Sequence, residues 1–190
     1  SSGYTSSKVI NSTNEIRTLR PNTAFVANVL FGEYNPSGRL PVTFYKSTDQ
    51  LPDFADYDMK GRTYRFMKEE PSYHFGFCLS YTDFEYKRAK YNLKDNSVEC
   101  LVKNIGELDG DEVVQVYIKR ENDRHGIVKE LAGFKRIHIK AGKTEKIVIP
   151  LSDDIFLEFD DTLDTFVESN DKLQIYCGSS SRNADLIPCK

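Results

Sequence analysis

The feature that most constrains the fold is a series of short segments after Thr82 in which apolar and polar residues alternate. A two-residue period is typical of a β-strand with one buried face. Turn sequences such as Asp109-Gly110 and Ala141-Gly142-Lys143 separate the segments. The residues expected to face inward are Val98, Cys100 and Val102; Val114, Val116 and Ile118; Ile137 and Ile139; Ile147, Ile149 and Leu151; and Leu173, Ile175 and Cys177.

Further strands are expected at residues 84–91 and 156–160. About seven strands over roughly a hundred residues, separated by turns, predict an immunoglobulin-like sandwich. The fold class is therefore mainly β.

The segments before this region have weaker patterns. Residues 1–22 are rich in Ser, Thr and Asn and predict an irregular lead-in. The apolar residues of 23–32 fit a short helix, with Thr23 as N-cap and Gly32 at the C-cap. A turn at 34–39 then leads into a short strand expected over 40–45.

No period holds from Lys46 to Ser80, where Pro, Gly, Asp, Tyr and Phe are frequent. A loop of this length is uncommon unless it is functional or packs along another domain. Its many aromatic residues favour packing over disorder. This segment, called the arm below, is expected to present Tyr57, Tyr64, Phe66 and Tyr73 at an apolar surface.

Composition argues against several classes of protein. The net charge is -3 and the pI is near 5.7, which gives no field for nucleic acid or an anionic membrane. No apolar run reaches the length of a membrane-spanning helix. Cys78, Cys100, Cys177 and Cys189 contain no C-x-x-C pair, and the three His are scattered, so neither a zinc site nor any other cofactor is expected. Cys100 and Cys177 fall on predicted inner faces and are expected to be free thiols.

Several ordered motifs resemble glycoside hydrolase family 3. Residues 31–44, FGEYNPSGRLPVTF, are similar to the segment that closes the second, α/β sandwich domain in that family. Residues 58–66 resemble its GRTYRY stretch, and residues 74–82 resemble its entry into the third domain. Residues 102–117 and the sequence ELAGFKR at 130–136 resemble its fibronectin type III-like domain. Several motifs in the family's order and spacing are a far stronger signal than one short pattern.

The resemblance implies three parts: residues 1–45 as the end of the α/β sandwich domain, 46–81 as an extended linker arm, and 82–190 as a fibronectin type III-like domain. It implies a parent glycosidase of the β-glucosidase or β-xylosidase type, secreted or periplasmic. Retaining members use two carboxylates about 5 Å apart. In the family both come from regions that precede the recognised segment, so no catalytic residue is assigned here. The partners implied are the upstream barrel and α/β domains.

Local groups offer weak alternatives for chemistry. The acidic residues Asp53, Asp56 and Asp58, and the pairs Glu69-Glu70, Asp153-Asp154 and Asp160-Asp161, are interpreted as turn-forming or solvated carboxylates, because a general acid needs an apolar pocket. Ser179 to Ser181 and His125 could suggest a hydrolase site. The sequence contains no Gly-x-Ser-x-Gly motif, which would place a nucleophilic serine on a tight turn. Ser179 to Ser181 are interpreted as the polar end of the last strand.

The arm offers the only candidate contacts with a substrate rim or a neighbouring domain: Tyr57, Arg62, Tyr64 and Arg65. Packing is favoured over sugar binding, since aromatic side chains mostly serve as buried mass. Two functions remain open at this point. The first is an accessory part of a family 3 glycosidase, inactive alone, with self-association through the arm as a further option. The second is a stand-alone β-sandwich module that binds an oligosaccharide or a protein.

Overall fold

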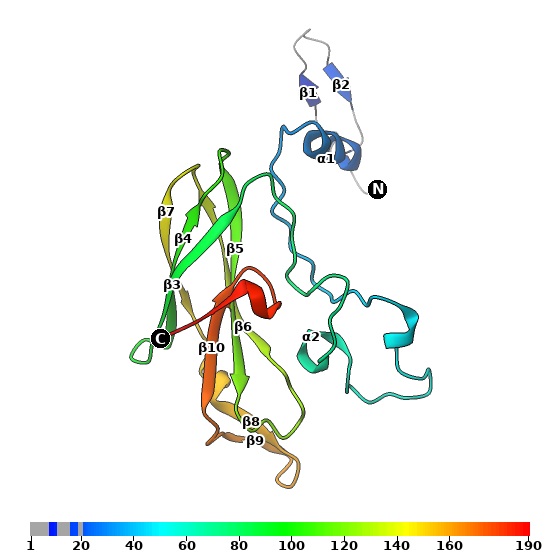
Figure 1. Cartoon of the computed structure of the whole chain (residues 1–190), viewed down its shortest axis with the longest axis vertical. Helices are drawn as coiled ribbons and strands as arrows, with labels where there is room; N and C mark the ends of the chain where they lie inside the picture. The colour runs from blue at the N-terminus through cyan, green and yellow to red at the C-terminus, as the bar shows by residue number, and fades with distance from the viewer. Residues whose placement is uncertain (1–7, 11–15, 19–20) are drawn as a thin grey trace, which may run out of the picture. The chain divides into compact units, whose positions relative to one another are not determined.

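The structure is a computed structural model and describes residues 8–10, 16–18 and 21–190 (Figure 1). The chain divides into two compact units, Ser1–Pro36 and Ser37–Lys190, and each is described by itself. None of the described helices is long and apolar enough to cross a membrane.

The first unit contains a hairpin and a helix. Strands β1 (Lys8–Ile10) and β2 (Ile16–Thr18) pair antiparallel, where the sequence predicted only an irregular lead-in; the rest of 1–20 lies outside the described residues. The expected helix is present as α1 (Pro21–Leu30). It begins two residues earlier than predicted, so Thr23 lies inside it and is not the N-cap. Pro21 suits a first helical position because its missing N–H has no partner to lose there. Gly32 has φ +76° and follows the helix end, as expected.

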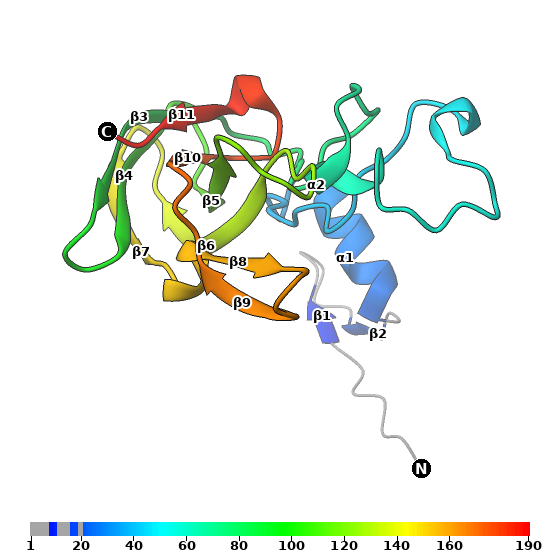
Figure 2. The ribbon, with the colours of Figure 1, turned by 90° about the horizontal axis from the view of Figure 1, so that it is seen from below.

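The second unit is built on a β-sandwich, and the prediction of about seven strands in such a fold is confirmed (Figures 1 and 2). One sheet has the order β11-β10-β5-β6 and the other β3-β4-β7, and every neighbouring pair is antiparallel. The strands are β3 (Phe84–Asn92), β4 (Ser97–Asn104), β5 (Gly110–Arg120), β6 (Glu130–Ile139), β7 (Thr144–Pro150), β10 (Leu173–Gly178) and β11 (Leu186–Pro188). A separate hairpin pairs β8 (Leu157–Asp160) with β9 (Thr165–Glu168). Short 3-10 turns lie at Asp153–Phe156 and Asn183–Asp185.

The core lies between the two sheets and contains the residues that alternation assigned to it. Val98, Val102, Val114 and Val116 have no exposed surface, and Ile147 and Ile149 have almost none. Cys100 and Cys177 are also fully buried, and the structure has both as free thiols. Burying aliphatic side chains of this size stabilises a fold by about 1.5–3 kcal/mol each.

The prediction that only one face of β5 is buried is wrong. Gln115 and Tyr117 point away from the sandwich core, yet they are only 3% and 0% exposed. The arm covers this second face of β5: the ring of Tyr64 lies edge-on to Tyr117 at 6.0 Å. The strand therefore has neighbours on both sides.

The arm carries little regular structure of its own. It contains a 3-10 turn at Thr48–Gln50 and the four-residue helix α2 (Thr63–Phe66). The strand expected over 40–45 is reduced to a single antiparallel bridge between Phe44 and Tyr73. Two further bonds, Leu40 N to Phe77 O at 3.0 Å and Gly76 N to Leu40 O at 2.8 Å, fasten the start of this segment to the end of the arm. With Pro41 unable to donate, no continuous ladder forms.

Candidate functional site

A buried ion pair joins the segment before the arm to the sandwich. Arg39 follows the turn at 34–38, and its guanidinium pairs with Glu112, the third residue of β5. Glu112 is 2% exposed, and the hydroxyl of Tyr86 on β3 donates to its other oxygen at 2.6 Å. Burial raises the pKa of the Glu112 carboxyl, while Arg39 and Tyr86 oppose that rise. Because an unpaired buried charge is costly, these three side chains hold one another in place.

A second set of polar contacts surrounds Gln115. Its amide nitrogen donates to the carbonyl oxygens of Ser179 at 2.5 Å and Gly76 at 3.4 Å. The hydroxyl of Tyr117 donates to its amide oxygen at 2.6 Å. Gly76 has φ +81°, and a Cβ there would lie 2.2 Å from Gln115 Oε1. Glycine is therefore required at this close approach of the arm to β5.

The middle of the arm packs on the sandwich through aromatic rings. Tyr64 of α2 stacks on Phe75 with ring centroids 4.3 Å apart and planes 20° apart. The Tyr64 hydroxyl accepts the main-chain N–H of Leu131 at 3.2 Å. Burial is the main cause that raises the pKa of Tyr64. Contacts of this kind fix α2 against the sheet.

The four candidate residues of the arm do not converge on one site. Tyr57 is 86% exposed and lies away from the sheet contacts. Arg62 donates to the main-chain oxygens of Asp56 and Asp58 and so closes a local turn. Arg65 pairs with Glu130 at the start of β6, and Tyr64 is partly buried rather than presented to solvent.

The acidic residues of the arm form turns, as the sequence predicted. Asp53 Oδ1 accepts from Ala55 N at 2.9 Å, Asp56 Oδ1 from Asp58 N at 2.9 Å, and Asp58 Oδ1 from Lys60 N at 3.0 Å. These are side-chain-to-backbone turns typical of Asp. Their carboxylates are engaged locally.

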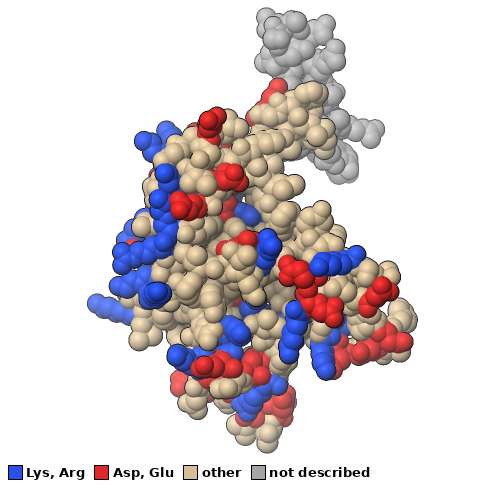
Figure 3. Space-filling view, in the orientation of Figure 1, with Lys and Arg blue, Asp and Glu red and all other residues tan. Residues whose placement is uncertain are grey.

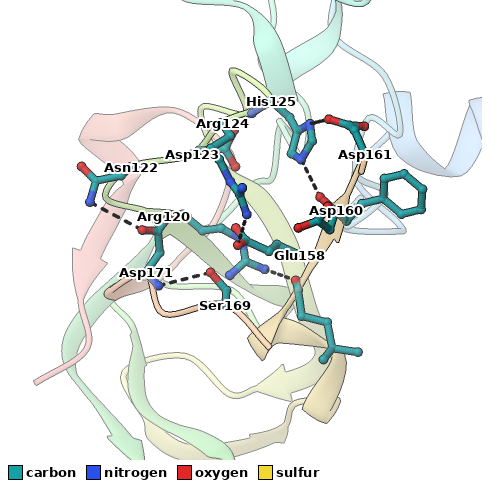
Figure 4. A network of polar contacts seen from close by, with 12 residues as sticks. Arg120, Asn122, Asp123, Arg124, His125, Glu158, Asp160, Asp161, Ser169 and Asp171 are labelled. Carbon is teal, nitrogen blue, oxygen red and sulfur yellow. Dashed lines mark hydrogen bonds and ion pairs between the residues drawn. The ribbon is translucent and has the colours of Figure 1, made fainter. Parts of the chain in front are cut away.

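His125 belongs to a network of polar contacts that fastens the β8–β9 hairpin (Figure 4). One ring nitrogen of His125 lies 3.0 Å from Phe159 O, and Arg124 pairs with Glu158. Arg120, at the end of β5, donates to the carbonyl oxygens of Ile155 at 2.9 Å and Leu157 at 2.7 Å. These contacts attach the hairpin to the sheet.

The three serines after β10 do not form a hydrolase site with His125, which contacts the β8–β9 hairpin instead. The hydroxyl of Ser180 donates to Asp185 at 2.6 Å, and Ser180 and Ser181 are both buried. They lie after the end of β10 and before β11, so the prediction that they form the polar end of the last strand is wrong.

A pocket of about 450 Å³ lies between the arm and the sandwich. The arm contributes its residues from α2 to His74, and the sandwich contributes Lys129, just before β6, and the turn at 181–184. The amide of Ser181 donates to Phe75 O at 2.9 Å, and that of Val128 donates to Arg65 O at 2.5 Å. These main-chain bonds fix both walls. The surface seen in Figure 3 carries charges of both signs, with Lys and Arg gathered along its left edge.

Sequence reasoning missed the residues that hold arm and sandwich together: Arg39, Tyr86, Glu112 and Gln115. One signal was present. Glu112 lies two residues before Val114 and four before Val116, so its carboxylate falls on the face of the strand that is predicted to be buried. Since charged groups are rarely buried without a partner, that position pointed to a cation elsewhere in the chain.

Two family models match the chain in sequence order. The "Glycosyl hydrolase family 3 C-terminal domain" matches residues 21–81, and the "Fibronectin type III-like domain" matches residues 112–181. The fold and the order of the matches thus define a fibronectin type III-like sandwich preceded by a segment that matches the family 3 C-terminal domain.

Named relatives agree with this assignment. A xylan 1,4-beta-xylosidase of Xylanibacter ruminicola is 43% identical over 165 residues, which are 85% of this chain and 19% of that protein. A beta-xylosidase of Formosa agariphila is 36% identical and a thermostable beta-glucosidase B of Acetivibrio thermocellus is 34% identical; the matches cover 85% and 83% of this chain and 24% of each protein. The chain spans about a fifth to a quarter of the length of these relatives.

Solved structures show the same fold. The beta-glucosidase D2-BGL of Chaetomella raphigera is 26% identical with a TM-score of 0.75, over 91% of this chain and 29% of that one. The beta-glucosidase DesR of Streptomyces venezuelae has a TM-score of 0.77 at 22% identity, over 90% and 25% of the two chains. The chain belongs to glycoside hydrolase family 3 and corresponds to the C-terminal part of its members.

Proposed function

We propose that this chain is the non-catalytic C-terminal part of an enzyme that hydrolyses β-xylosides or closely related β-glycosides. The observation that carries the proposal is the ordered match of both C-terminal family domains, together with the identity to proteins named β-xylosidases. The catalytic carboxylates would then come from preceding domains, in line with the local roles of the arm's acidic residues.

The outer part of the arm supplies the proposed contact with those domains. Phe54 is 96% exposed and Tyr57 86%, and Leu51 and Met59 are each about half exposed. A group of apolar side chains this exposed is typical of an interaction surface. The inner part of the arm, around Tyr64 and Phe75, already has its partner in β5.

The experiment is a hybrid enzyme. The matched region of the Xylanibacter ruminicola relative is replaced by this chain, and hydrolysis of nitrophenyl β-D-xyloside is measured with thermal stability. We expect an active, stable hybrid. Phe54→Ser together with Tyr57→Ser should lower the melting temperature of the hybrid, while Leu93→Ser, at an exposed apolar position in the turn between β3 and β4, should leave it unchanged.

Two results would count against this role. The first is that the Xylanibacter ruminicola relative keeps its xyloside hydrolysis and its melting temperature when the whole matched region is deleted. That result favours a stand-alone binding module. The other is turnover of about one per second by this chain alone on nitrophenyl glycosides, which is an ordinary enzymatic rate.

A further inference from the structure

The pocket between the arm and the sandwich contains a lysine with unusual surroundings. Lys129 Nζ donates to Ser181 O at 2.7 Å and to the side-chain oxygen of Asn183, both uncharged acceptors. Among the described residues, no carboxylate oxygen lies within 4 Å of it. Burial lowers the pKa of Lys129 and the charge of Lys119 adds to this effect, while Glu70 opposes it. An ammonium has three N–H donors, and two are used.

Two residues that line this pocket carry hydroxyl groups with no hydrogen-bond partner among the described residues. The hydroxyl groups belong to Thr43, from the segment before the arm, and to Ser181, which is 3% exposed. A buried hydroxyl left unpaired costs about 1–3 kcal/mol. Both are among the few such atoms in the described part of the chain, but each has less than 1 Å² of accessible surface, so neither is open to a molecule in the pocket.

The rim adds further charge. Of the ionisable residues that line the pocket, Lys68, Lys129 and Arg182 are cations and Glu69 and Glu70 are anions, beside His74. Glu70 is held by His74 at 2.9 Å, and Arg182 Nε lies 3.9 Å from the same carboxylate oxygen. Arg182 therefore keeps most of its donors for a ligand. A surplus of positive charge around a desolvated ammonium favours an anion.

We propose that this pocket binds a sugar residue that carries a carboxylate, a uronate. The carboxylate would sit between Lys129 and Arg182, and sugar hydroxyls would pair with the polar side chains that line the open part of the pocket. The binding chemistry comes from the pocket itself; the choice of a sugar over another carboxylate rests on the proposed glycosidase function. A pocket of about 450 Å³ has room for one or two such units.

The test uses the full chain and D-glucuronate, with D-glucose and acetate as matched probes, followed by amide chemical shifts and titration calorimetry. Glucuronate should bind at least about tenfold more tightly than glucose or acetate. Its shifts should centre on the amides of Lys129, Ser181 and Arg182. Added salt should weaken glucuronate binding and leave glucose unaffected.

Variants assign the effect to residues. Lys129→Met should reduce glucuronate affinity to the level of glucose. Arg182→Gln changes an exposed side chain whose one ionic contact with the described residues is long, and it should lower affinity several-fold with the fold unchanged. Lys94→Met, an exposed lysine in the turn between β3 and β4, is the control and should bind as the unmodified chain does.

Equal affinity for glucuronate and glucose would overturn the proposal, as would equal shifts from acetate or shifts centred outside the pocket. None of these results depends on the hybrid enzyme. An active hybrid together with no uronate binding would reject this inference alone. Uronate binding, together with a relative that is equally active and stable when the matched region is deleted, would reject the accessory role alone.

Discussion

Replacement of Arg39 by methionine would remove the cation that compensates Glu112. The carboxylate would remain 2% exposed, with the Tyr86 hydroxyl as its remaining partner. Breaking a buried ion pair by removing one member costs about 3–5 kcal/mol, because the other charge stays buried and uncompensated. Since Tyr86 stays and Arg39 is itself partly exposed, we expect the lower end, about 3 kcal/mol.

Urea unfolding followed by circular dichroism measures this loss. With a denaturant dependence of about 2 kcal/mol/M, a loss of about 3 kcal/mol moves the midpoint by about 1.5 M. Arg88→Met provides the control, since Arg88 is exposed on β3 and has no ion pair among the described residues. Its midpoint should stay close to that of the unmodified chain.

The pH dependence gives a sharper check. The pKa of Glu112 is raised in the folded protein, so the folded state binds more protons than the unfolded state between the ordinary pKa of Glu and the folded one. Stability contributed by this group is therefore present at low pH and lost as pH rises through that window. Without Arg39 the folded pKa rises further, so the loss caused by Arg39→Met should shrink on acidification. A loss under 1 kcal/mol, or one that is the same at pH 4 and pH 7, would refute this reasoning.

Four further outcomes are expected. Gly76→Ala should lower the unfolding free energy by about 2 kcal/mol in the same urea assay, because the new Cβ meets Gln115 at 2.2 Å and φ is +81°; unchanged stability would contradict the close approach. Val116→Asp should unfold the sandwich, and a well-dispersed NMR spectrum of that variant would show that Val116 does not face the core. Cys100 and Cys177 have no exposed surface, so both should resist alkylation in the native protein and react in urea without reductant; a linked peptide in mass spectrometry would argue for a disulfide. In hydrogen exchange, amides of residues 63–77 should be protected and those of 51–60 should exchange faster, at any protein concentration; uniform exchange along the arm would be evidence against its division into two parts.

Much of the sandwich could be predicted from the sequence because its information is local. A two-residue period fixes which face of a strand is apolar, and Val98, Cys100 and Val102 show it without ambiguity. The same logic put Cys177 and Val116 each on an inner face, and the structure pairs the two residues across β10 and β5. Short-range patterns of this kind need no knowledge of distant partners.

The contacts that hold the arm could not be predicted in this way, because they join residues far apart in the chain. The side chains of Gln115 and Tyr117 are polar or amphipathic, and alternation assigns such residues to solvent. Only the approach of Gly76 and Tyr64, around forty to fifty residues away in sequence, makes that face of β5 an interior. Periodicity reports that a residue can face water, and it does not report whether another segment covers it.

The two faces of β5 also explain why the arm divides into two parts. In its inner part, the rings of Tyr64 and Phe75 stack on each other, and the main-chain N–H groups of Val128 and Ser181 donate to carbonyl oxygens of the arm. Its outer part, around Phe54 and Tyr57, has no comparable cover within the described residues. Burying one aromatic side chain of this size stabilises a protein by on the order of 1.5–3 kcal/mol, so a partner surface that covered both would be stabilised by contact with them.

The arm is anchored on its own sandwich at one end and exposes apolar side chains at the other. Contact between its outer part and a neighbouring domain would therefore be linked directly to β5. That arrangement suits an accessory domain better than a free-standing module, since a free-standing module has no neighbouring domain to cover the outer part.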